Sequence, residues 1–551
     1  MEESVRSMAS SMPSSTSSGT SASPAEEPAG RRAYNAAVDF VDANVARGLA
    51  DKVAFVDPAR SLTYGDLQCA TCRFACGLQV LGLRPESRIL LLMLDTVDYP
   101  VAFWGAIRAG IVPIPLNTLL NPKQYAYIFE DSRAEAIIVS GALAKTLEPV
   151  IAQSDSIRTL IVAGGEADAV TTLAHHRFED VLKLAESDVW CAPTCSDEVA
   201  FWLYSSGSTG EPKGTRHVHT SLMATAKLYG QDILGIREDD VVFSAAKLFF
   251  AYGLGNAMSF PMSVGATAVL VPERPTPDKV FDVMRRHRPT IFYGVPTLYA
   301  ALLAHKDIGR GAGSDRLRLC VSAGEALPAN VGERWRDLVG VDILDGIGST
   351  EMLHIFVSNR PDDIRYGTSG KLVPGYDARI LDENDGDVAQ GEIGELVVRG
   401  PSAADGYWNQ RSKSRHTFAG EWTYTGDKYV RDADGYYCYC GRTDDMFKVS
   451  GIWVSPFEVE AALVSHPAVL EAAVVGREDA EGLTKPKAFV VLKSGYLPGD
   501  ALFEELKSHV KERAGIWKYP RWIDIRNELP KTATGKIQRF KLREEDADAT
   551  T

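Results

Sequence analysis

Two hydrophobic patterns alternate along most of the chain from about residue 34 onward. Amphipathic stretches such as residues 62–83 repeat their apolar positions roughly every 3.6 residues, as helices do. Short runs of Val, Ile and Leu stand between these stretches, as at residues 136–139, 160–163 and 266–271. Helices that alternate with buried strands are typical of βαβ units, whose strands lie parallel. The predicted fold class is therefore α/β, with a large N-terminal domain built on parallel-rich sheets.

The pattern changes twice in the second half of the chain. Residues 367–441 contain closely spaced strands and turns, which predict an antiparallel β subdomain that closes the large domain. After Arg442, a block of roughly 100 residues alternates helix and strand patterns and predicts a small α+β domain. The predicted organisation is a disordered Ser-rich leader at 1–33, a large domain at 34–441, a hinge at 442–445, a small domain at 446–545 and a tail at 546–551.

The longest stretch without charged residues, 248–272, reaches the length of a transmembrane helix. It contains Gly253, Gly255, Pro261 and Gly265 and ends in the β-rich sequence ATAVLV, so a buried helix followed by a buried strand fits it better. The Ser-rich start of the chain has no apolar segment, which argues against a secretory signal. We therefore expect no membrane span, and a leader that is dispensable for chemistry.

Composition narrows the function classes. The 551 residues are 45% hydrophobic and 24% charged, which is ordinary for a globular protein. Lys and Arg number 59 against 73 for Asp and Glu, and the net charge of −14 argues against binding nucleic acid through a basic surface. Eight cysteines are few for this length and indicate a reduced, cytoplasmic protein. Cys69, Cys72 and Cys76 lie at helical spacing, so we predict small core-facing residues rather than metal ligands.

A glycine-rich loop at 204–214 follows the strand-like sequence VAFWLY and is the most informative segment. Its glycines allow tight turns, and its hydroxyls together with Lys213 can surround the oxygens of a polyphosphate. The spacing differs from a Walker A loop, because Lys213 lies three residues past Gly210 and Gly214 follows it. A surface loop rich in serine and glycine is the alternative on composition alone. The candidate anion ligands are Ser205, Ser206, Gly207, Ser208, Thr209, Gly210 and Lys213.

Further motifs follow in order along the chain. They are DGIGSTE at 345–351, GELVVRGPSAADGYW at 394–408, YTGD at 424–427, GRTDDMFKVSG at 441–451 and PKTATGK at 530–536. With the glycine-rich loop, these motifs make the chain similar to the adenylate-forming superfamily, which includes acyl-CoA synthetases, peptide adenylation domains and luciferases. The sequences KLFFAYGLGN and GSTEMLHIF most resemble the group of benzoate-CoA and 4-hydroxybenzoate-CoA ligases. The resemblance extends upstream to about residue 34.

This resemblance implies a nucleotide side of the site. It implies that the glycine-rich loop holds the β- and γ-phosphates of ATP, that Thr350 lies near the α-phosphate, and that Glu351 binds Mg²⁺, which prefers carboxylate oxygen. Asp427 is expected to accept hydrogen bonds from both ribose hydroxyls, with Arg442 assisting. Lys536 is expected to bridge carboxylate and α-phosphate as charge develops. The implied catalytic residues are Lys536, Lys213, Thr350 and Glu351, and the implied nucleotide contacts add Asp345, Gly346, Asp427 and Arg442 to the loop.

The resemblance also implies an acyl side and a hinge. Aromatic walls beside small residues suit a flat, compact ring better than a long alkyl chain. Tyr252 or His354 could hydrogen-bond a para-hydroxyl group or only pack, and the sequence leaves both open. Asp444 matches the pivot about which the mobile small domain turns, and Lys448 and Gly451 would then face the CoA tunnel, although Lys448 could instead be an exposed strand lysine. The implied acyl pocket is Phe250, as a gate, with Ala251, Tyr252, Ala323, Gly348, His354 and Ile355.

The sequence therefore predicts a ligase that converts an aromatic carboxylate, ATP and CoA into aroyl-CoA, AMP and pyrophosphate through an acyl-adenylate, with Mg²⁺ and no other metal. We expect small-molecule partners only, no nucleic acid, no membrane, and a monomer or homodimer. One alternative is an adenylating enzyme that loads a carrier-protein thiol, although the short acidic stretch after the lysine motif predicts no carrier domain in the same chain. Another is a nucleotide-binding pseudoenzyme, against which the intact Lys213, Glu351, Asp427, Arg442 and Lys536 argue.

Overall fold

The computed structural model describes residues 33–165, 173–185, 188–205, 211–449, 452–479, 481–531 and 537–548. Residues 1–32 of the predicted leader lie outside this range, and so do residues 206–210 of the glycine-rich loop, Gly451 and Lys536. Among the helices of the described ranges, none is long and apolar enough to cross a bilayer.

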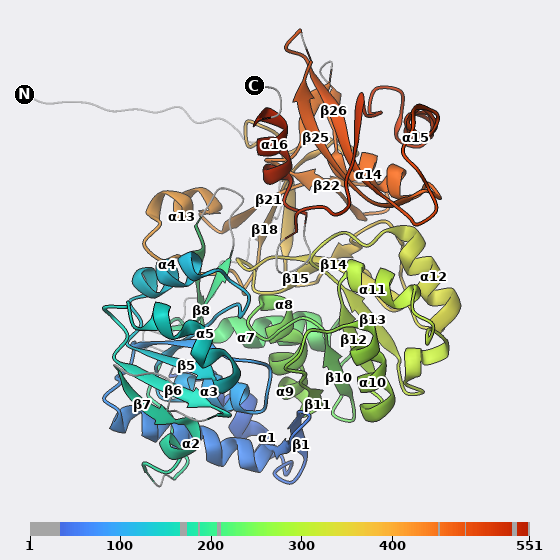
Figure 1. Cartoon of the computed structure of the whole chain (residues 1–551). Coiled ribbons are helices and arrows are strands. Elements are labelled where there is room, and N and C mark those ends of the chain that lie inside the picture. Colours follow the sequence, from blue (N-terminus) through green and yellow to red (C-terminus); the bar gives the residue numbers. More distant parts are fainter. Residues whose placement is uncertain are drawn as a thin grey trace, which may run out of the picture. The chain divides into compact units, whose positions relative to one another are not determined.

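A nine-stranded sheet forms one half of the large domain (Figure 1). In spatial order the strands are β16 (Lys371–Leu372), β15 (Ile355–Ser358), β14 (Ile343–Gly348), β13 (Leu319–Ser322), β12 (Ile291–Gly294), β10 (Val241–Ser244), β11 (Thr267–Val269), β1 (Val53–Val56) and β2 (Ser61–Thr63). Its six central strands, from β14 to β1, pair in parallel, and the strands outside them pair antiparallel. The helices α10 (Pro277–His287), α11 (Pro296–Leu303) and α12 (Ala329–Val339) make crossovers that parallel pairing requires.

The charge-free stretch at 248–272 lies inside this half, as the sequence predicted. It forms three short helical segments in succession, followed by strand β11, and its apolar side chains are mostly buried. The segments are α8 (Ala251–Leu254), η3 (Gly255–Ser259) and α9 (Phe260–Val264). Burial inside a sheet-and-helix core explains why the stretch needs no charged residue.

A second, wholly parallel sheet forms the other half of the large domain (Figure 1). All five residues of its central strand β5 are buried, which is why that strand is a continuous apolar run rather than an alternating one. The strands in order are β4 (Val112–Pro115), β3 (Arg88–Leu92), β5 (Ala136–Ser140), β6 (Thr159–Ala163) and β7 (Ala174–Arg177). The helices are η1 (Val38–Asp42), α1 (Ala43–Ala46), α2 (Tyr64–Val80), α3 (Asp98–Arg108), α4 (Pro122–Ser132), α5 (Gly141–Ile151) and α6 (Phe178–Val181). A single cluster of buried apolar side chains joins the two halves.

The three cysteines of helix α2 differ in their surroundings. Cys72 is buried and Cys76 is half-buried, where its sulfur accepts a hydrogen bond from Trp190 Nε1 at 3.0 Å. Cys69 is exposed, so the prediction that all three face the core is wrong for this residue. The buried stripe of α2 runs through Leu67 and Phe74, and Cys69 falls outside that stripe.

Two antiparallel sheets complete the large domain, and residues 367–441 form most of them, as predicted. A three-stranded sheet has the order β19 (Gly406–Tyr407), β9 (Lys213–Val218) and β8 (Val199–Ser205). A five-stranded sheet contains β17 (Asp377–Leu381), β18 (Gly394–Arg399), β21 (Trp422–Arg431), β20 (Phe418–Ala419) and β22 (Tyr437–Arg442). The helical segments beside them are α7 (His219–Thr225), η2 (Ala226–Gln231) and α13 (Arg411–Thr417), and η4 (Arg310–Gly313) lies between α11 and β13.

The chain after Arg442 forms an α+β arrangement. A hairpin of β23 (Phe447–Val449) and β24 (Ile452–Val454) precedes a sheet of β25 (Val469–Glu478), β26 (Thr484–Leu492) and β27 (Trp522–Ile525). The helices are α14 (Pro456–Val464), α15 (Asp500–Ala514) and α16 (Arg539–Asp548). Helix α16 continues beyond residue 545, where the tail was predicted to begin, and Asp546 is buried against Lys487 Nζ at 2.6 Å.

Candidate active site

The glycine-rich loop leaves and rejoins the sheet as a β-hairpin. Strands β8 and β9 pair antiparallel, with Ser205 opposite Lys213, so the two ends of the loop lie side by side. The base of the hairpin is fixed by Asp131, whose carboxylate accepts from Tyr204 Oη at 2.6 Å and whose carbonyl accepts from Trp408 Nε1 at 2.9 Å. Within the described part of the chain, the buried Ser205 hydroxyl has no hydrogen-bond partner. The predicted ligands at 206–210 lie outside the described residues.

Three charged and polar side chains converge beside this hairpin. Tyr407 Oη donates to Glu351 Oε1 at 2.7 Å, and Lys213 Nζ lies 3.2 Å from Tyr407 Oη and 3.9 Å from Glu351 Oε1. Burial lowers the pKa of Lys213, and the Glu351 carboxylate opposes that shift. The structure thus brings two predicted catalytic residues together through Tyr407. Sequence reasoning gave Tyr407 no role, although it stands inside the GYW motif.

The Glu351 carboxylate fits a magnesium ion bound together with a nucleotide. Its side chain is 16% exposed, and one oxygen already has a donor in Tyr407. Mg²⁺ is usually held by one or two carboxylates with substrate phosphates and water rather than by a full protein cage. No group of three or more His, Cys, Asp or Glu side chains that could hold a metal ion occurs within the described ranges.

A buried histidine forms a hydrogen bond to the main chain of Thr350. His217 Nε2 lies 2.9 Å from the Thr350 carbonyl oxygen, and because a carbonyl only accepts, this nitrogen carries the proton. Burial lowers the pKa of His217 to about 4, so the imidazole is neutral near pH 7. His217 follows the glycine-rich loop by a few residues, and no motif in the sequence singled it out.

Asp345 lies below the surface of the site. Its carboxylate accepts from the main-chain N–H of Leu327 at 3.3 Å, and burial raises its pKa to about 8. The next residue, Gly346, has no room for a side chain, because an added Cβ would lie 2.8 Å from the Val357 carbonyl oxygen. The expected contact of Asp345 and Gly346 with the nucleotide stays a prediction.

Asp427 and Arg442 are cross-strand neighbours on β21 and β22. Arg442 Nη1 donates to Asp427 Oδ1 at 3.1 Å and to the Thr425 carbonyl oxygen at 3.0 Å. The Asp427 side chain is 13% exposed and that of Arg442 is 41% exposed, so the pair opens toward solvent on the arginine side. The sequence predicted that these two residues act together, and the structure pairs them.

The predicted acyl residues are held by the protein's own main chain. Tyr252 Oη lies 3.2 Å from the carbonyl oxygens of both Gly294 and Val321. His354 Nε2 lies 3.3 Å from the Tyr252 carbonyl oxygen and 3.2 Å from Asn256 Oδ1. Burial lowers the pKa of His354 to about 3, so this ring is neutral as well. The polar atoms of Tyr252 and His354 therefore serve first to fix the two rings.

Close packing surrounds the His354 ring. Its centroid lies 4.5 Å from that of Phe260 and 5.6 Å from that of Tyr252. A Cβ added to Gly348 would lie 2.5 Å from the His354 carbonyl oxygen, so only glycine fits there. The remaining predicted pocket residues lie at the ends of secondary-structure elements: Phe250 is the N-cap of α8 and Ala251 its first residue, Ala323 follows β13 and Ile355 begins β15.

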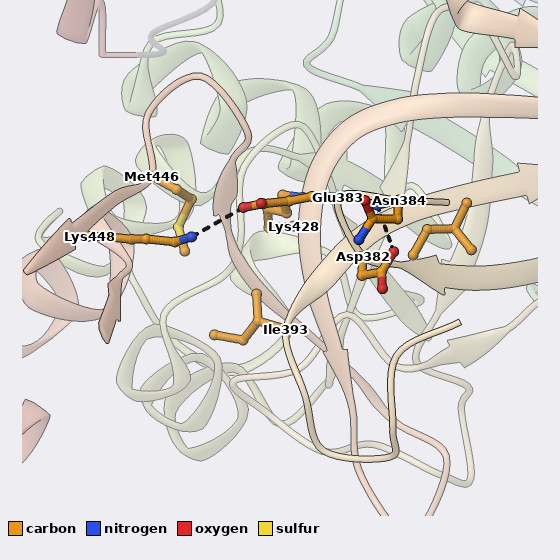
Figure 2. Close-up of a pocket in the computed structure, with 8 residues that line it drawn as sticks. Asp382, Glu383, Asn384, Ile393, Lys428, Met446 and Lys448 are labelled. Carbon is orange, nitrogen blue, oxygen red and sulfur yellow. Dashed lines mark hydrogen bonds and ion pairs between the residues drawn. The ribbon is translucent and has the colours of Figure 1, made fainter. Parts of the chain in front are cut away.

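The predicted hinge and its neighbours lie between β22 and β23. Asp444 is in the turn that follows Arg442, and Lys448 Nζ on β23 is 3.2 Å from Glu383 Oε1 of the large domain. Figure 2 shows this ion pair across a cleft of about 230 Å³, which is lined by Leu381, Asp382, Glu383, Asn384, Ile393, Lys428, Met446 and Lys448. Gly451 and Lys536 lie outside the described residues, and a bridge between Lys531 and Ile537 brackets the latter.

Comparisons with known proteins agree with this arrangement. A profile described as AMP-binding enzyme matches residues 42–408, and one described as AMP-binding enzyme C-terminal domain matches residues 458–536. The chain is 57% identical over 514 residues to a 4-hydroxybenzoate–CoA/benzoate–CoA ligase of Rhodopseudomonas palustris, covering 93% of this chain and 94% of that protein. It is 55% identical over 516 residues to a benzoate–CoA ligase of Thauera aromatica, covering 93% and 96%.

A solved structure shares the fold. The benzoate CoA ligase from Burkholderia xenovorans LB400 superposes with a TM-score of 0.85 at 52% sequence identity, covering 93% of this chain and all of that one. The match spans both the large domain and the small unit that follows Arg442. The predicted α/β class, with its antiparallel sheets and C-terminal domain, is therefore confirmed.

Proposed function

We propose that this chain, which belongs to the AMP-binding enzyme family, joins an aromatic carboxylate to CoA at the expense of ATP. The products are aroyl-CoA, AMP and pyrophosphate. The relatives named for ligating benzoate and 4-hydroxybenzoate to CoA match nearly the whole chain, which supports benzoate-like acids as substrates here.

One structural observation carries the proposal. The short segment between β14 and β15 contributes to both sides of the site. Its Glu351 faces Lys213 and its Thr350 contacts His217, while its His354 contacts Tyr252. An acid bound against His354 therefore lies a few residues along the chain from the charges that would hold a polyphosphate. Reactants held close together gain most of the entropic advantage of an intramolecular reaction.

The first step makes the carboxylate a better electrophile. A carboxylate oxygen attacks the α-phosphorus of ATP, the bond from that phosphorus to the bridging oxygen breaks, and pyrophosphate leaves. Repulsion between the carboxylate and the phosphates opposes this step, and fixed positive charge reduces it. In our proposal Lys213 binds the β- and γ-phosphates, Thr350 lies at the α-phosphate, and Lys536 bridges the two reacting groups.

Two other groups complete the nucleotide side. Magnesium, when bound with ATP, neutralises phosphate charge, and Glu351 is the residue that would hold it. The Asp427 carboxylate would accept hydrogen bonds from the ribose hydroxyls, with Arg442 keeping that carboxylate in place at 3.1 Å. Asp345, Gly346 and the hydroxyls of the glycine-rich loop are proposed as the remaining nucleotide contacts.

The second step transfers the acyl group to sulfur. The CoA thiol, after loss of its proton, attacks the acyl carbon of the adenylate, and AMP leaves as the carbon–oxygen bond breaks. We propose that the small domain at 446–545 turns about Asp444, within the hinge at 442–445, between the two steps. Lys448 and Gly451 then face the thiol, and Lys448 must leave Glu383 to do so.

A substrate experiment tests the proposal. Purified protein is incubated with MgATP and benzoate, with and without CoA, and AMP and benzoyl-CoA are quantified by mass spectrometry. We expect AMP and benzoyl-CoA in equal amounts, and only with CoA present. Adenylate without any acyl-CoA would move the acceptor to another thiol, and no AMP with any benzoate would overturn the proposal.

The Lys536→Ala variant is the matched test of the first step. We expect it to lose adenylate formation by a factor of 100 or more, the order of removing one transition-state contact, while ATP binding measured by calorimetry is retained. Unchanged turnover would contradict the role proposed for this lysine.

A further inference from the structure

An ionic network joins two helices of the small domain to the hinge turn. At the start of α16, Arg539 donates to both oxygens of Glu460 on α14, with Nε–Oε1 at 2.9 Å and Nη2–Oε2 at 2.6 Å. Two-bond pairing of this kind fixes the relative orientation of the two planar groups. The third segment is the turn after β22, where Asp445 Oδ1 accepts from Arg543 Nη1 at 2.8 Å and Oδ2 lies 3.5 Å from Arg539 Nη1.

The network is shielded from water on one side. The side chains of Arg539, Glu460 and Asp445 are 18%, 8% and 16% exposed, whereas that of Arg543 is 37% exposed. Glu460 Oε1 also accepts from the main-chain N–H of Val474 on β25 at 2.7 Å, which ties the network to the sheet. Salt screens partly buried pairs much less than exposed ones, and loss of one partner leaves a poorly solvated charge. These contacts should therefore keep their geometry when the domain moves.

Asp445 stands directly after the predicted pivot. The main-chain N–H groups of Asp445 and Met446 both donate to the Arg442 carbonyl oxygen, each at 3.0 Å. The Arg442 side chain in turn pairs with Asp427 of the large domain. The main-chain N–H of Thr443 donates to the Gly426 carbonyl oxygen of the large domain at 2.9 Å. Asp444 therefore lies between Thr443, which is bonded to the large domain, and Asp445, which is bonded to α16, and a rotation at this position would turn one against the other.

We propose that Asp445 is a positioning residue that fastens helix α16 to the pivot, so that the turn of the small domain carries α16 with it. Helix α16 begins at Arg539, three residues after Lys536 in the sequence, and three residues of extended chain span only about 10 Å. The inference rests on the proposed function, because it explains how a change at Asp444 is transmitted to the residue proposed for the first step. Loosening the Asp445 contact should therefore slow adenylate formation selectively.

The two half-reactions separate this role from a merely structural one. Asp445→Asn keeps the shape of the side chain and removes its charge. We expect acid-dependent pyrophosphate release to fall about tenfold, as for a weakened charge-assisted contact, while thioester formation from supplied benzoyl-adenylate changes less than twofold. The double variant with Arg543→Gln should be no worse than Asp445→Asn alone, because both remove one interaction. Equal losses in both half-reactions, or no loss in either, would overturn the inference.

Glu545→Gln is the matched control, because Glu545 pairs with Arg526 at 3.1 Å from the same helix and does not contact the hinge. It should leave both half-reactions unchanged; a similar selective loss there would contradict the specific role of Asp445. Hydrogen exchange of residues 537–548 supplies a readout that needs no turnover. We expect faster exchange in Asp445→Asn than in the wild type or Glu545→Gln, and identical exchange in all three would refute the coupling even if the substrate proposal failed.

Discussion

The two sides of the candidate site use their polar atoms differently. On the acyl side, Tyr252 Oη and His354 Nε2 are bonded to main-chain carbonyls and to a buried amide, so these two polar atoms already have partners within the protein. On the nucleotide side, Lys213 and Glu351 face each other beside Tyr407, and these charges must exchange partners when a ligand binds. We therefore predict that the proposed acyl side selects by a rigid shape, and the proposed nucleotide side by charge that rearranges.

The largest loss of activity is expected from a substitution on the nucleotide side. Glu351→Gln removes the charge that would hold Mg²⁺ and that faces Lys213 at 3.9 Å. Acid-dependent pyrophosphate release should fall by a factor of 100 to 1,000, the usual order for loss of an electrostatic contact to a reacting phosphate. The exposed Glu421→Gln variant, which changes an ion pair with Arg399, is the control. A loss below threefold in Glu351→Gln would contradict the assignment.

A smaller effect is expected when the acyl side loses its main-chain anchor. Tyr252→Phe removes the hydroxyl that lies 3.2 Å from the Gly294 and Val321 carbonyl oxygens. Val321 keeps the Tyr299 hydroxyl as a donor at 2.9 Å, so Gly294 is the carbonyl that loses this donor, which costs about 1–3 kcal/mol when such a group stays buried. We expect kcat/KM for benzoate to fall roughly 5- to 100-fold, measured by steady-state kinetics, with the KM for ATP within twofold of the wild type. Equal changes in kcat/KM for benzoate and in the KM for ATP would contradict the idea that the acyl side and the nucleotide side act independently.

The corresponding prediction for the nucleotide side concerns Arg442. Arg442→Gln weakens the anchor of Asp427, so we expect the KM for ATP to rise about tenfold while the KM for benzoate stays constant. Arg399→Gln on the same sheet, whose partner Asp377 is exposed, should change neither value. A raised KM for benzoate in Arg442→Gln would contradict the idea that Arg442 acts on the nucleotide side alone.

Both sides rest on buried neutral imidazoles, which gives the smallest expected effect, a pH dependence. Burial lowers the pKa of His217 to about 4 and that of His354 to about 3, against 6.5 in the unfolded chain. Below pH 6.5 the unfolded chain therefore binds more protons than the folded protein. The stabilisation that these two neutral histidines contribute is fully present above pH 6.5 and is lost as the pH drops toward 4. His354→Gln should flatten the fall of Tm between pH 6.5 and 4. An unchanged slope would contradict a neutral buried His354.

The sequence predicted some parts of this account better than others. Buried strands such as β5 and the helix-and-strand stretch at 248–272 follow from local hydrophobic patterns, which tertiary contacts reinforce here. Resemblance placed Lys213 and Glu351 in one site, and the structure supplies their 3.9 Å separation. The prediction for Cys69 was wrong, because helical spacing alone does not locate the edge of a buried stripe.

The residues that sequence reasoning missed act across long separations in the chain. His217 supports Thr350 from 133 positions away, and Tyr407 joins Glu351 from 56 positions away. Trp408 reaches Asp131 over 277 positions. Neither periodicity nor motif spacing encodes such pairings, because they arise only when β9 and β19 come together in one sheet. The GYW motif was the one available signal, and it indicated Tyr407 without its role.

A comparison of substrates tests most directly whether a rigid aromatic pocket binds the acid that this CoA ligase activates. We would measure kcat/KM for CoA-dependent AMP release with benzoate, 4-hydroxybenzoate, 2-aminobenzoate, phenylacetate and octanoate. We expect kcat/KM for at least one benzoate to exceed that for octanoate by a factor of 100 or more. A ligand that differs by several methylene groups from the shape of the pocket loses a few kcal/mol of binding free energy. Octanoate turned over as well as every benzoate would contradict this expectation.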